Sequence, residues 1–437
     1  MPKSLKAYKL KIQEMQYLPI FYRKIMHRRV FQIAILLFLQ VVLVLGGWAQ
    51  PAAALTPEQQ LLSEAWRIVN RSYVDDSFNS KNWWSIREKA VKQPLNDRQQ
   101  TYTAIQGMLA NLDDPFTRLL KPEQYRSLQV NTSGELTGVG LQIAIDPQTN
   151  TLTVVAPLSG SPADKAGIQP LDRILKIDGT PTSELSLDEA ATRMRGRIGT
   201  PVTLTLGREG RDVAEEIELV RDRIALNPVY AELQSGSENL PVGYIRLSQF
   251  SANATEEVAH AIDRLEKQGA AAYILDLRNN PGGLLQAGIE IARLWLDSGT
   301  IVYTVNRQGI LGSFEASGQA LTNDALIVLV NKGTASASEI LAGALQDNGR
   351  AQLVGEKTFG KGLIQSLFDL SDGSGLAVTV AKYETPNHKD INKLGIAPDR
   401  VVPLEPIARD QIGTAADLQY QAALQLLKEK TVLAKSV

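Results

Sequence analysis

The sequence has no cysteine and only three histidines among its 437 residues. Disulfides are therefore excluded, and the composition fits an exported protein that folds without them. No His-Glu-x-x-His motif, no metal-type cysteine and histidine cluster and no complete dinucleotide-binding fingerprint is present. We therefore expect no metal and no other cofactor. The Gly-x-Ser-x-Gly motif is missing too, which argues against the catalytic triad of an α/β-hydrolase.

Acidic residues outnumber basic ones outside the first 54 residues. Those residues carry eight Lys or Arg and one Glu, so a chain with a formal charge of −1 has −8 over residues 55–437. An acidic chain of this kind lacks the basic footprint of a nucleic-acid-binding protein. We therefore expect no nucleic-acid partner.

The basic N-terminus leads into a long apolar run. Arg28 and Arg29 precede the run from Phe31 to Leu45, and the small residues Ala52 to Ala54 follow it as a cleavage pattern. This order predicts a signal peptide over residues 1–54, and hence export. An uncleaved membrane anchor is the alternative, and the arginine pair leaves open whether export is of the Sec or the twin-arginine type.

Hydrophobic periodicity divides the remaining chain into four parts. Residues 55–129 have the spacing of amphipathic helices, and residues 130–222 have short strand-like runs and one short helix. Strands and helices alternate over residues 223–410, which predicts a mostly parallel sheet, and residues 411–437 close the chain as a helix. The predicted fold class is multidomain α+β, with a helical N-terminal segment, a β module and an α/β core.

The stretch "NKGTASASE", residues 331–339, follows the apolar strand pattern "ALIVLV". Ser336 lies where a helix is predicted to begin, and the free N–H groups and positive potential of a helix N-terminus favour an alkoxide or an oxyanion. Ser336 is therefore a candidate nucleophile. The alternative is that Ser336 or Ser338 only caps the helix, because serine is a common cap.

A nucleophilic serine needs a base, and the histidines are poorly placed to be one. His260 falls in an amphipathic helix and His388 in a polar turn. Asp347 lies eleven residues beyond Ser336, or roughly 16 Å along a continuous helix. Lys361 in "GEKTFGKGLIQ" remains, and it can act as a base if desolvation or nearby positive charge lowers its pKa. A solvated loop lysine is the alternative.

The same stretch also matches most of a phosphate-binding loop, through Gly355, Gly360 and Lys361. The position of the magnesium-binding hydroxyl is Gly362, however, and the following "LIQSLFDL" alternates like a strand where such a loop would open a helix. A nucleotide hydrolase is therefore disfavoured.

Two glycine-containing stretches could present backbone N–H groups to a ligand. "RNNPGG" contains Gly282 and Gly283, which either donate to an oxyanion or form a simple turn. "GVGLQI" opens the β module, where a loop can hold a terminal carboxylate and the next strand can pair with an extended peptide, unless the stretch is an ordinary hairpin. The residues of that loop are Gly138, Val139, Gly140 and Leu141.

Together these motifs resemble the carboxyl-terminal processing peptidases, a family of serine–lysine proteases that contain a PDZ domain. "GVGLQI" and "SPADKAGIQPLDRILKIDG" resemble the PDZ domain, and "LDDPFT" resembles the helical-segment motif. "LDLRNNPGG", "NKGTASASEILAGALQDNGRA", "GEKTFGKGLIQ" and "DGSGLAVTVAKYETP" resemble the protease core. The likeness covers nearly the whole exported chain and extends to cyanobacterial and chloroplast enzymes that trim a photosystem II reaction-centre precursor. It therefore implies a thylakoid lumen or periplasm.

The resemblance also implies roles for individual residues. Ser336 is the implied nucleophile of an acyl-enzyme mechanism, Lys361 the general base and Gln365 the residue that orients the lysine. Ser338 is expected only to support the start of the helix. The N–H groups implied for the oxyanion hole belong to Ala337 and to either Gly282 or Gly283.

The expected partners are protein substrates with free, flexible C-termini. Membrane contact is expected only through the signal segment or membrane-bound substrates, and the oligomeric state is left open. The main alternative is a catalytically inactive PDZ scaffold that only binds peptides.

Overall fold

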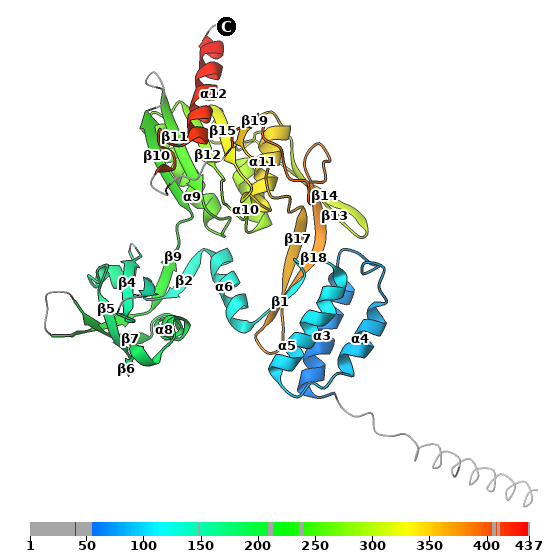
Figure 1. Cartoon of the computed structure of the whole chain (residues 1–437). Helices are drawn as coiled ribbons and strands as arrows, with labels where there is room; N and C mark the ends of the chain where they lie inside the picture. The colour runs from blue at the N-terminus through cyan, green and yellow to red at the C-terminus, as the bar shows by residue number, and fades with distance from the viewer. Residues whose placement is uncertain are drawn as a thin grey trace, which may run out of the picture. The chain divides into compact units, whose positions relative to one another are not determined.

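A computed structural model describes Gln40 and residues 55–435, apart from gaps at 147–148, 159, 209–212, 236–239, 404–407 and 409–410 (Figure 1). The signal peptide predicted over residues 1–54 lies outside the described residues, except for Gln40. Among the described helices, none has both the length and the apolar character that a bilayer crossing requires.

The N-terminal segment is helical because its apolar residues recur at helical spacing. Leu62, Ala65 and Val69 are fully buried along one face of the first helix. These helices pack onto Leu376 and Val378, which lie on a long strand of the core. The elements are α3 (Pro57–Ser72), α4 (Trp83–Val91), α5 (Arg98–Leu109), η1 (Ala110–Leu112), β1 (Arg118–Leu120) and α6 (Pro122–Ser133).

The β module is a small antiparallel sheet with two short helices. Its strand order is β3-β4-β5-β7-β8, so β3 lies at an edge, and Val154, Ile174 and Leu204 are fully buried in its core. The first and last strands of the segment, β2 (Glu135–Gly138) and β9 (Asp222–Ala225), pair with each other. The other elements are β3 (Leu141–Ile145), β4 (Leu152–Pro157), α7 (Pro162–Lys165), β5 (Arg173–Ile177), β6 (Thr180–Pro181), η2 (Thr182–Glu184), α8 (Leu187–Met194), β7 (Pro201–Gly207) and β8 (Glu215–Val220).

The core contains a six-stranded sheet with the order β10-β11-β12-β15-β16-β19. Pairing is parallel from β11 to β19, and only β10 runs antiparallel to its neighbour. The predicted mostly parallel sheet is therefore confirmed. Its strands are β10 (Val229–Ser235), β11 (Pro241–Leu247), β12 (Ala272–Asp276), β15 (Ala325–Val330), β16 (Ala351–Gly355) and β19 (Arg400–Val401).

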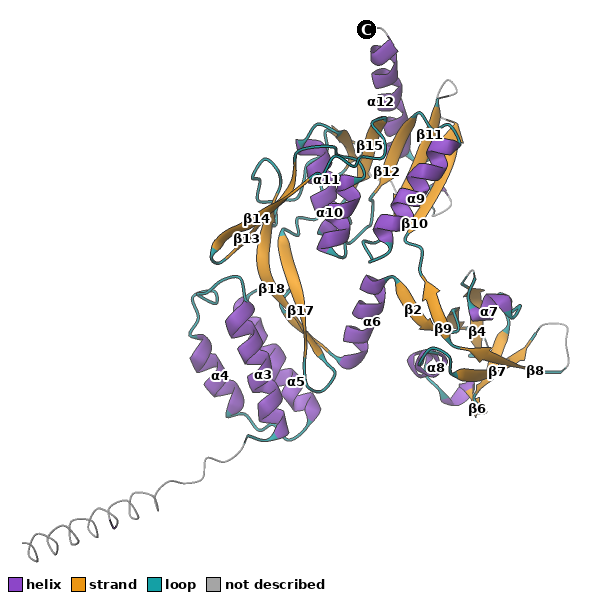
Figure 2. Cartoon of the chain, turned by 180° about the vertical axis from the view of Figure 1, so that it is seen from behind, coloured by secondary structure: helices purple, strands orange, loops and turns teal. Residues whose placement is uncertain are grey.

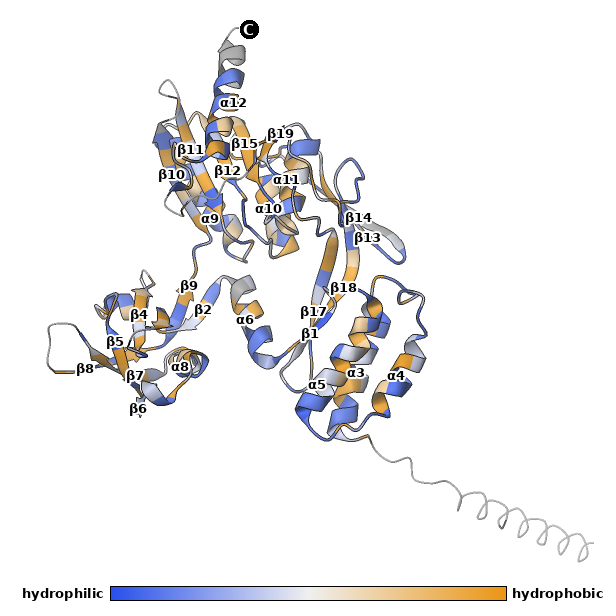
Figure 3. Cartoon of the chain, in the orientation of Figure 1, coloured by the Kyte–Doolittle hydropathy of each residue, from blue (hydrophilic) through white to orange (hydrophobic). Residues whose placement is uncertain are grey.

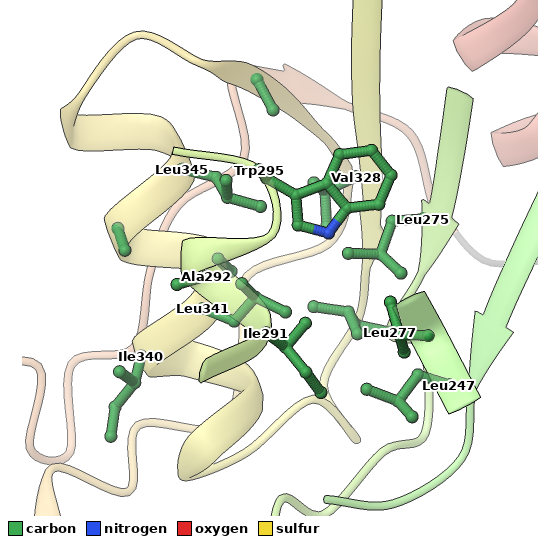
Figure 4. Close-up of a cluster of buried hydrophobic side chains, with 14 of the residues drawn as sticks. Leu247, Leu275, Leu277, Ile291, Ala292, Trp295, Val328, Ile340, Leu341 and Leu345 are labelled. Atoms are coloured by element: carbon green, nitrogen blue, oxygen red, sulfur yellow. The ribbon is translucent and has the colours of Figure 1, made fainter. Parts of the chain in front are cut away.

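Helices cover both faces of this sheet, so its central strands β12 and β15 are almost entirely buried and carry mostly apolar residues (Figures 2 and 3). The helices α9 (Ala254–Lys267), α10 (Leu285–Arg293) and α11 (Ala337–Asp347) pack on one face, and α12 (Leu418–Lys435) packs on the other. In Figure 4, Ile291 and Leu341 from two of these helices face Leu277 and Val328 from the sheet side. The resulting core is continuous with the start of α11, where the candidate serine lies.

A second sheet joins the N-terminal segment to the core. Strand β18 (Gly375–Glu384) pairs with β17 (Leu363–Asp369) along one edge, and with β1 and β13 (Thr300–Asn306) along the other; β14 (Gly309–Glu315) completes the sheet. The strand predicted for "LIQSLFDL" is confirmed by β17. The fold class predicted from the sequence is confirmed as well, whereas the domain boundaries stay predictions.

Candidate active site

Three hydroxyl side chains, those of Thr334, Ser336 and Ser338, lie where the chain passes from β15 into the first turn of α11, and their surroundings differ. Thr334 and Ser338 are fully buried, and their hydroxyls donate to the carbonyl oxygens of Leu277, at 2.8 Å, and Asn280, at 3.0 Å. Ser336 is partly exposed and lines a cavity. Ser338 thus ties the "RNNPGG" loop to the helix, and Ser336 is the hydroxyl that a substrate can reach.

The backbone of Ser336 has an unusual conformation, with φ 59° and ψ −119°. Such a conformation costs a non-glycine residue about 1–3 kcal/mol and persists only where neighbouring groups hold it. Here the N–H donates to the Glu339 carboxylate at 2.9 Å, and the carbonyl oxygen accepts from the Tyr383 hydroxyl at 3.1 Å. The result is a sharp strand-to-helix elbow that presents the side chain, although the Gly-x-Ser-x-Gly motif is absent.

Glu339 connects this elbow to the lysine loop. Its carboxylate is fully buried and accepts four hydrogen bonds. The donors are Ser336 N at 2.9 Å, the Thr358 hydroxyl at 2.5 Å, Gly360 N at 2.7 Å and Lys361 N at 2.8 Å. One buried acid therefore sets the relative positions of Ser336 and Lys361. Sequence reasoning missed this role; the available signal was the serine-x-x-glutamate spacing of a capping box.

Lys361 lies in an environment that disfavours its charged form. Burial lowers the pKa of its ammonium group, and the positive charge of Arg118 lowers it further, while Glu339 and Asp114 act in the opposite direction. The Lys361 Nζ also lies 5.0 Å from the centre of the Phe116 ring. Phe116 belongs to the "LDDPFT" motif and Arg118 directly follows it, so the N-terminal segment contributes directly to the surroundings of the lysine.

Ser336 and Lys361 line one cavity of about 490 Å³. No hydrogen bond joins the two side chains, although both are described in full. Gln365 lines the same cavity, but its amide donates to the Thr379 hydroxyl at 3.3 Å and makes no hydrogen bond to Lys361. The structure thus brings the three sequence-predicted side chains together around one space.

The two glycines of "RNNPGG" differ in the availability of their N–H groups. Gly282 N donates to the Asn280 side chain at 2.9 Å, whereas Gly283 N has no partner among the described residues. Gly282 needs to be glycine because a Cβ there would lie 2.8 Å from the Ser336 Cβ, at a φ of +95°. Ala337 N, in the first turn of α11, is likewise without a partner among the described residues. Gly283 and Ala337, which line the same cavity as Ser336, are therefore the two residues of these motifs whose N–H groups are free.

A buried ion-pair network holds the strand end from which that loop departs. The Arg278 guanidinium is 2.6 Å from the Asp276 carboxylate and 2.7 Å from that of Asp417, and all three side chains are almost fully buried. Although burial opposes it, Arg278 keeps the pKa of Asp417 below its ordinary value. Sequence reasoning missed this network, because Asp417 is distant in sequence and belongs to the segment before α12.

The predicted peptide-binding loop of the β module borders a small cavity of about 50 Å³. Its walls include all four loop residues and also Ile143 from β3 and Met194 from α8. Gly140 has a φ of +78°, and a Cβ there would lie 2.2 Å from the Ser161 Cβ, so this position requires glycine. The edge position of β3 leaves one side of that strand open to pairing.

Comparison with known proteins agrees with this arrangement. A sequence profile of Peptidase family S41 matches residues 241–402, and a PDZ domain profile matches residues 153–208. A carboxyl-terminal-processing protease from Synechocystis sp. is 63% identical over 400 residues, which cover 92% of this chain and 93% of the relative. The chain belongs to the S41 family of carboxyl-terminal-processing proteases.

Other S41 relatives extend the comparison. The chloroplastic carboxyl-terminal-processing peptidase 2 of Arabidopsis thaliana is 48% identical, over 81% of this chain and 70% of the relative. The solved structure of a photosystem II D1 C-terminal processing protease is 44% identical, with a TM-score of 0.52, over 80% of this chain and 94% of that one. This S41 protein is therefore a serine-type peptidase that acts on protein substrates, and it has relatives in cyanobacteria and chloroplasts.

Proposed function

We propose that Ser336 is the nucleophile and Lys361 the general base of this C-terminal-processing endopeptidase. The observation that carries the proposal is that a strained, accessible serine and a partly buried lysine with a lowered pKa line one cavity. The neutral lysine takes the Ser336 proton as the hydroxyl oxygen attacks the scissile carbonyl carbon. The leaving amine takes that proton, and water then hydrolyses the acyl-enzyme.

The negative charge of the tetrahedral intermediate is held, in this proposal, by Gly283 N and Ala337 N. Gly283, Ala337 and Ser336 line the same cavity, and neither N–H group is used by another described residue. Preorganised donors of this kind act on charge that develops only in the transition state. The proton transfer requires Ser336 and Lys361 to come within hydrogen-bond reach, and catalytic hydrogen bonds often tighten only once substrate is bound. Gln365 would then orient the lysine from the cavity wall.

The proposed substrate is the precursor of a photosystem II reaction-centre subunit, from which the enzyme removes a C-terminal extension. Support comes from the likeness to a photosystem II D1 C-terminal processing protease and from the chloroplastic relatives. The signal pattern over residues 1–54 supports a location in a thylakoid lumen or periplasm. The PDZ module would hold the free carboxylate of the tail at its glycine loop while β3 pairs with the tail.

The decisive experiment compares protein C-termini in the native host with and without active enzyme. A host strain whose enzyme carries Ser336→Ala should accumulate the uncut precursor, which mass spectrometry of C-terminal peptides would identify. Ser338→Ala is the matched control, because it removes a neighbouring hydroxyl outside the cavity. Normal processing in the Ser336→Ala strain would contradict the proposal.

A further inference from the structure

Arg118 is placed in the wall of the active-site cavity by strand pairing. It opens β1 and lies opposite Ala377 of β18, and Ala377 pairs on its other side with Leu367 of β17. All three residues line the cavity that contains Ser336. Arg118 also lines a second cavity of about 400 Å³, to which residues of α5 and α6 contribute, so Arg118 borders both spaces.

The charge around this cavity is one-sided. Arg118 and Lys361 line it, and none of its described lining residues is Asp or Glu. Lys361 must be neutral to act as a base, whereas arginine stays charged at any working pH. Arg118 therefore supplies the permanent positive charge of the cavity that contains the nucleophile.

The Arg118 guanidinium makes few contacts within the protein. Its side chain is exposed, forms no ion pair with a described residue, and makes only a 3.5 Å contact with the Phe116 carbonyl oxygen. Asp114, which lines the second cavity together with Arg118, is already engaged: its two oxygens accept from Phe116 N and from the Thr117 hydroxyl. An unpaired guanidinium in a cavity wall is suited to bind a carboxylate with two parallel hydrogen bonds.

We propose that Arg118 is an anion subsite of the active-site cavity and binds a substrate carboxylate near the scissile bond. The inference rests on the proposed roles of Ser336 and Lys361, since it places the acid relative to the bond that they cleave. The carboxylate has two sources, an acidic side chain of the substrate or the terminal carboxylate of a short tail. Either source offers the same pair of oxygens to the guanidinium.

The test scans one residue along a peptide that the full-length enzyme cleaves. Peptides of equal length carry Glu, Gln or Lys at one of three positions on either side of the scissile bond, and kcat/KM is measured for each. We expect one position where Glu is preferred over Gln by about 10-fold to 100-fold, as charged hydrogen bonds would give. A second set of peptides lacks Glu, and each of these peptides has its C-terminus at the preferred position, either as a free acid or as an amide. Faster cleavage of the free acid would identify the terminal carboxylate as the group that binds.

Arginine variants then assign the preference. Arg118→Gln should abolish it, Arg118→Lys should keep part of it, and Arg118→Glu should turn it toward the Lys peptide. The ratio between two peptides is informative because a changed basicity of Lys361 alters both rates by the same factor. Arg126→Gln is the control: Arg126 is exposed on α6 and lies outside the described linings of both cavities, so the preference should persist.

The outcomes separate this inference from the proposed function. A wild-type enzyme that cleaves every peptide with equal kcat/KM overturns the Arg118 subsite alone. A preference for Glu that survives in Arg118→Gln and Arg118→Glu also overturns it. A wild-type enzyme that cleaves none of the peptides, including the neutral ones, contradicts the proposed function and the subsite with it.

Discussion

Glu339 accepts the backbone N–H of Lys361 at 2.8 Å, deep inside the protein. The same carboxylate accepts the N–H of Ser336 at 2.9 Å, so the geometry of the candidate dyad depends on an acid that need not touch substrate. The elbow is strained, and the lysine is partly buried in surroundings that disfavour its charged form. A fully satisfied buried carboxylate is a rigid support for both features.

The first prediction separates the serines. Ser336→Ala should abolish turnover, because the attacking oxygen is lost, while thermal unfolding changes little. Ser338→Ala should keep substantial activity but lower the free energy of unfolding by about 1–2 kcal/mol, because a buried hydrogen bond to Asn280 is lost. Peptide cleavage and thermal melts on both variants make the comparison. The reverse pattern would mean that the nucleophile has been assigned to the wrong serine.

The second prediction concerns pH. Burial and Arg118 lower the pKa of Lys361, and the base works when neutral, so kcat/KM should rise with pH through that lowered pKa to a plateau. Arg118→Gln removes a positive charge and should shift the rising limb to higher pH, whereas Arg118→Lys should leave it near the wild-type position. Lys361→Arg should be inactive at every pH, since arginine cannot lose its proton. An active Lys361→Arg enzyme would refute the dyad.

The third prediction concerns Glu339. Glu339→Gln puts an amide N–H₂ where backbone donors already point, so at least one of its four hydrogen bonds is lost. We expect a loss of at least 100-fold in kcat/KM and about 2–4 kcal/mol in unfolding free energy. Glu356→Gln is the control, because Glu356 pairs with the exposed Lys332 and should contribute at most about 1 kcal/mol. Equal effects of the two substitutions would contradict the connecting role of Glu339.

The fourth prediction concerns the buried network. Asp417→Asn leaves Arg278 with one carboxylate partner and should cost about 3–5 kcal/mol of stability near neutral pH. The folded-state pKa of Asp417 is lowered, so its contribution is complete above the ordinary value near 4 and is lost as pH falls through the folded value. The stability gap between wild type and Asp417→Asn should therefore narrow in acid. A gap that is constant from pH 7 to pH 2 would contradict this assignment.

The fifth prediction concerns substrate selection by the PDZ module. A tail with a free carboxylate should be cut about a hundredfold faster than its amide at sub-saturating concentration, because roughly two charged hydrogen bonds are lost. Substituting Gly140 by Ala should remove that difference, since a Cβ there would lie 2.2 Å from the Ser161 Cβ. The Gly179→Ala variant is the control, as no atom lies within 4 Å of a Cβ at that turn, which has a similar positive φ. Equal rates for acid and amide would exclude the mechanism.

The sequence by itself determined the fold class, the family and two of the candidate residues. These inferences depend on short-range patterns: apolar periodicity defines strands and helices, and Ser336 and Lys361 each sit in a long local motif. The helix that begins after Ser336 was predictable because a strand pattern and a helical pattern meet there. Sequence patterns predict a structural feature correctly where the interactions that produce the feature join residues close together in the chain.

Only the tertiary structure decided which of the neighbouring groups can take part in chemistry. Ser338 and Gly282 share their motifs with Ser336 and Gly283, but each is already bonded to Asn280. The pairing of β1 with β18 brings Arg118 to the cavity that Ser336 and Lys361 line, more than two hundred residues further along the chain. Accessibility, hydrogen-bond satisfaction and charge proximity depend on contacts between distant segments, and no local pattern in the sequence specifies those contacts.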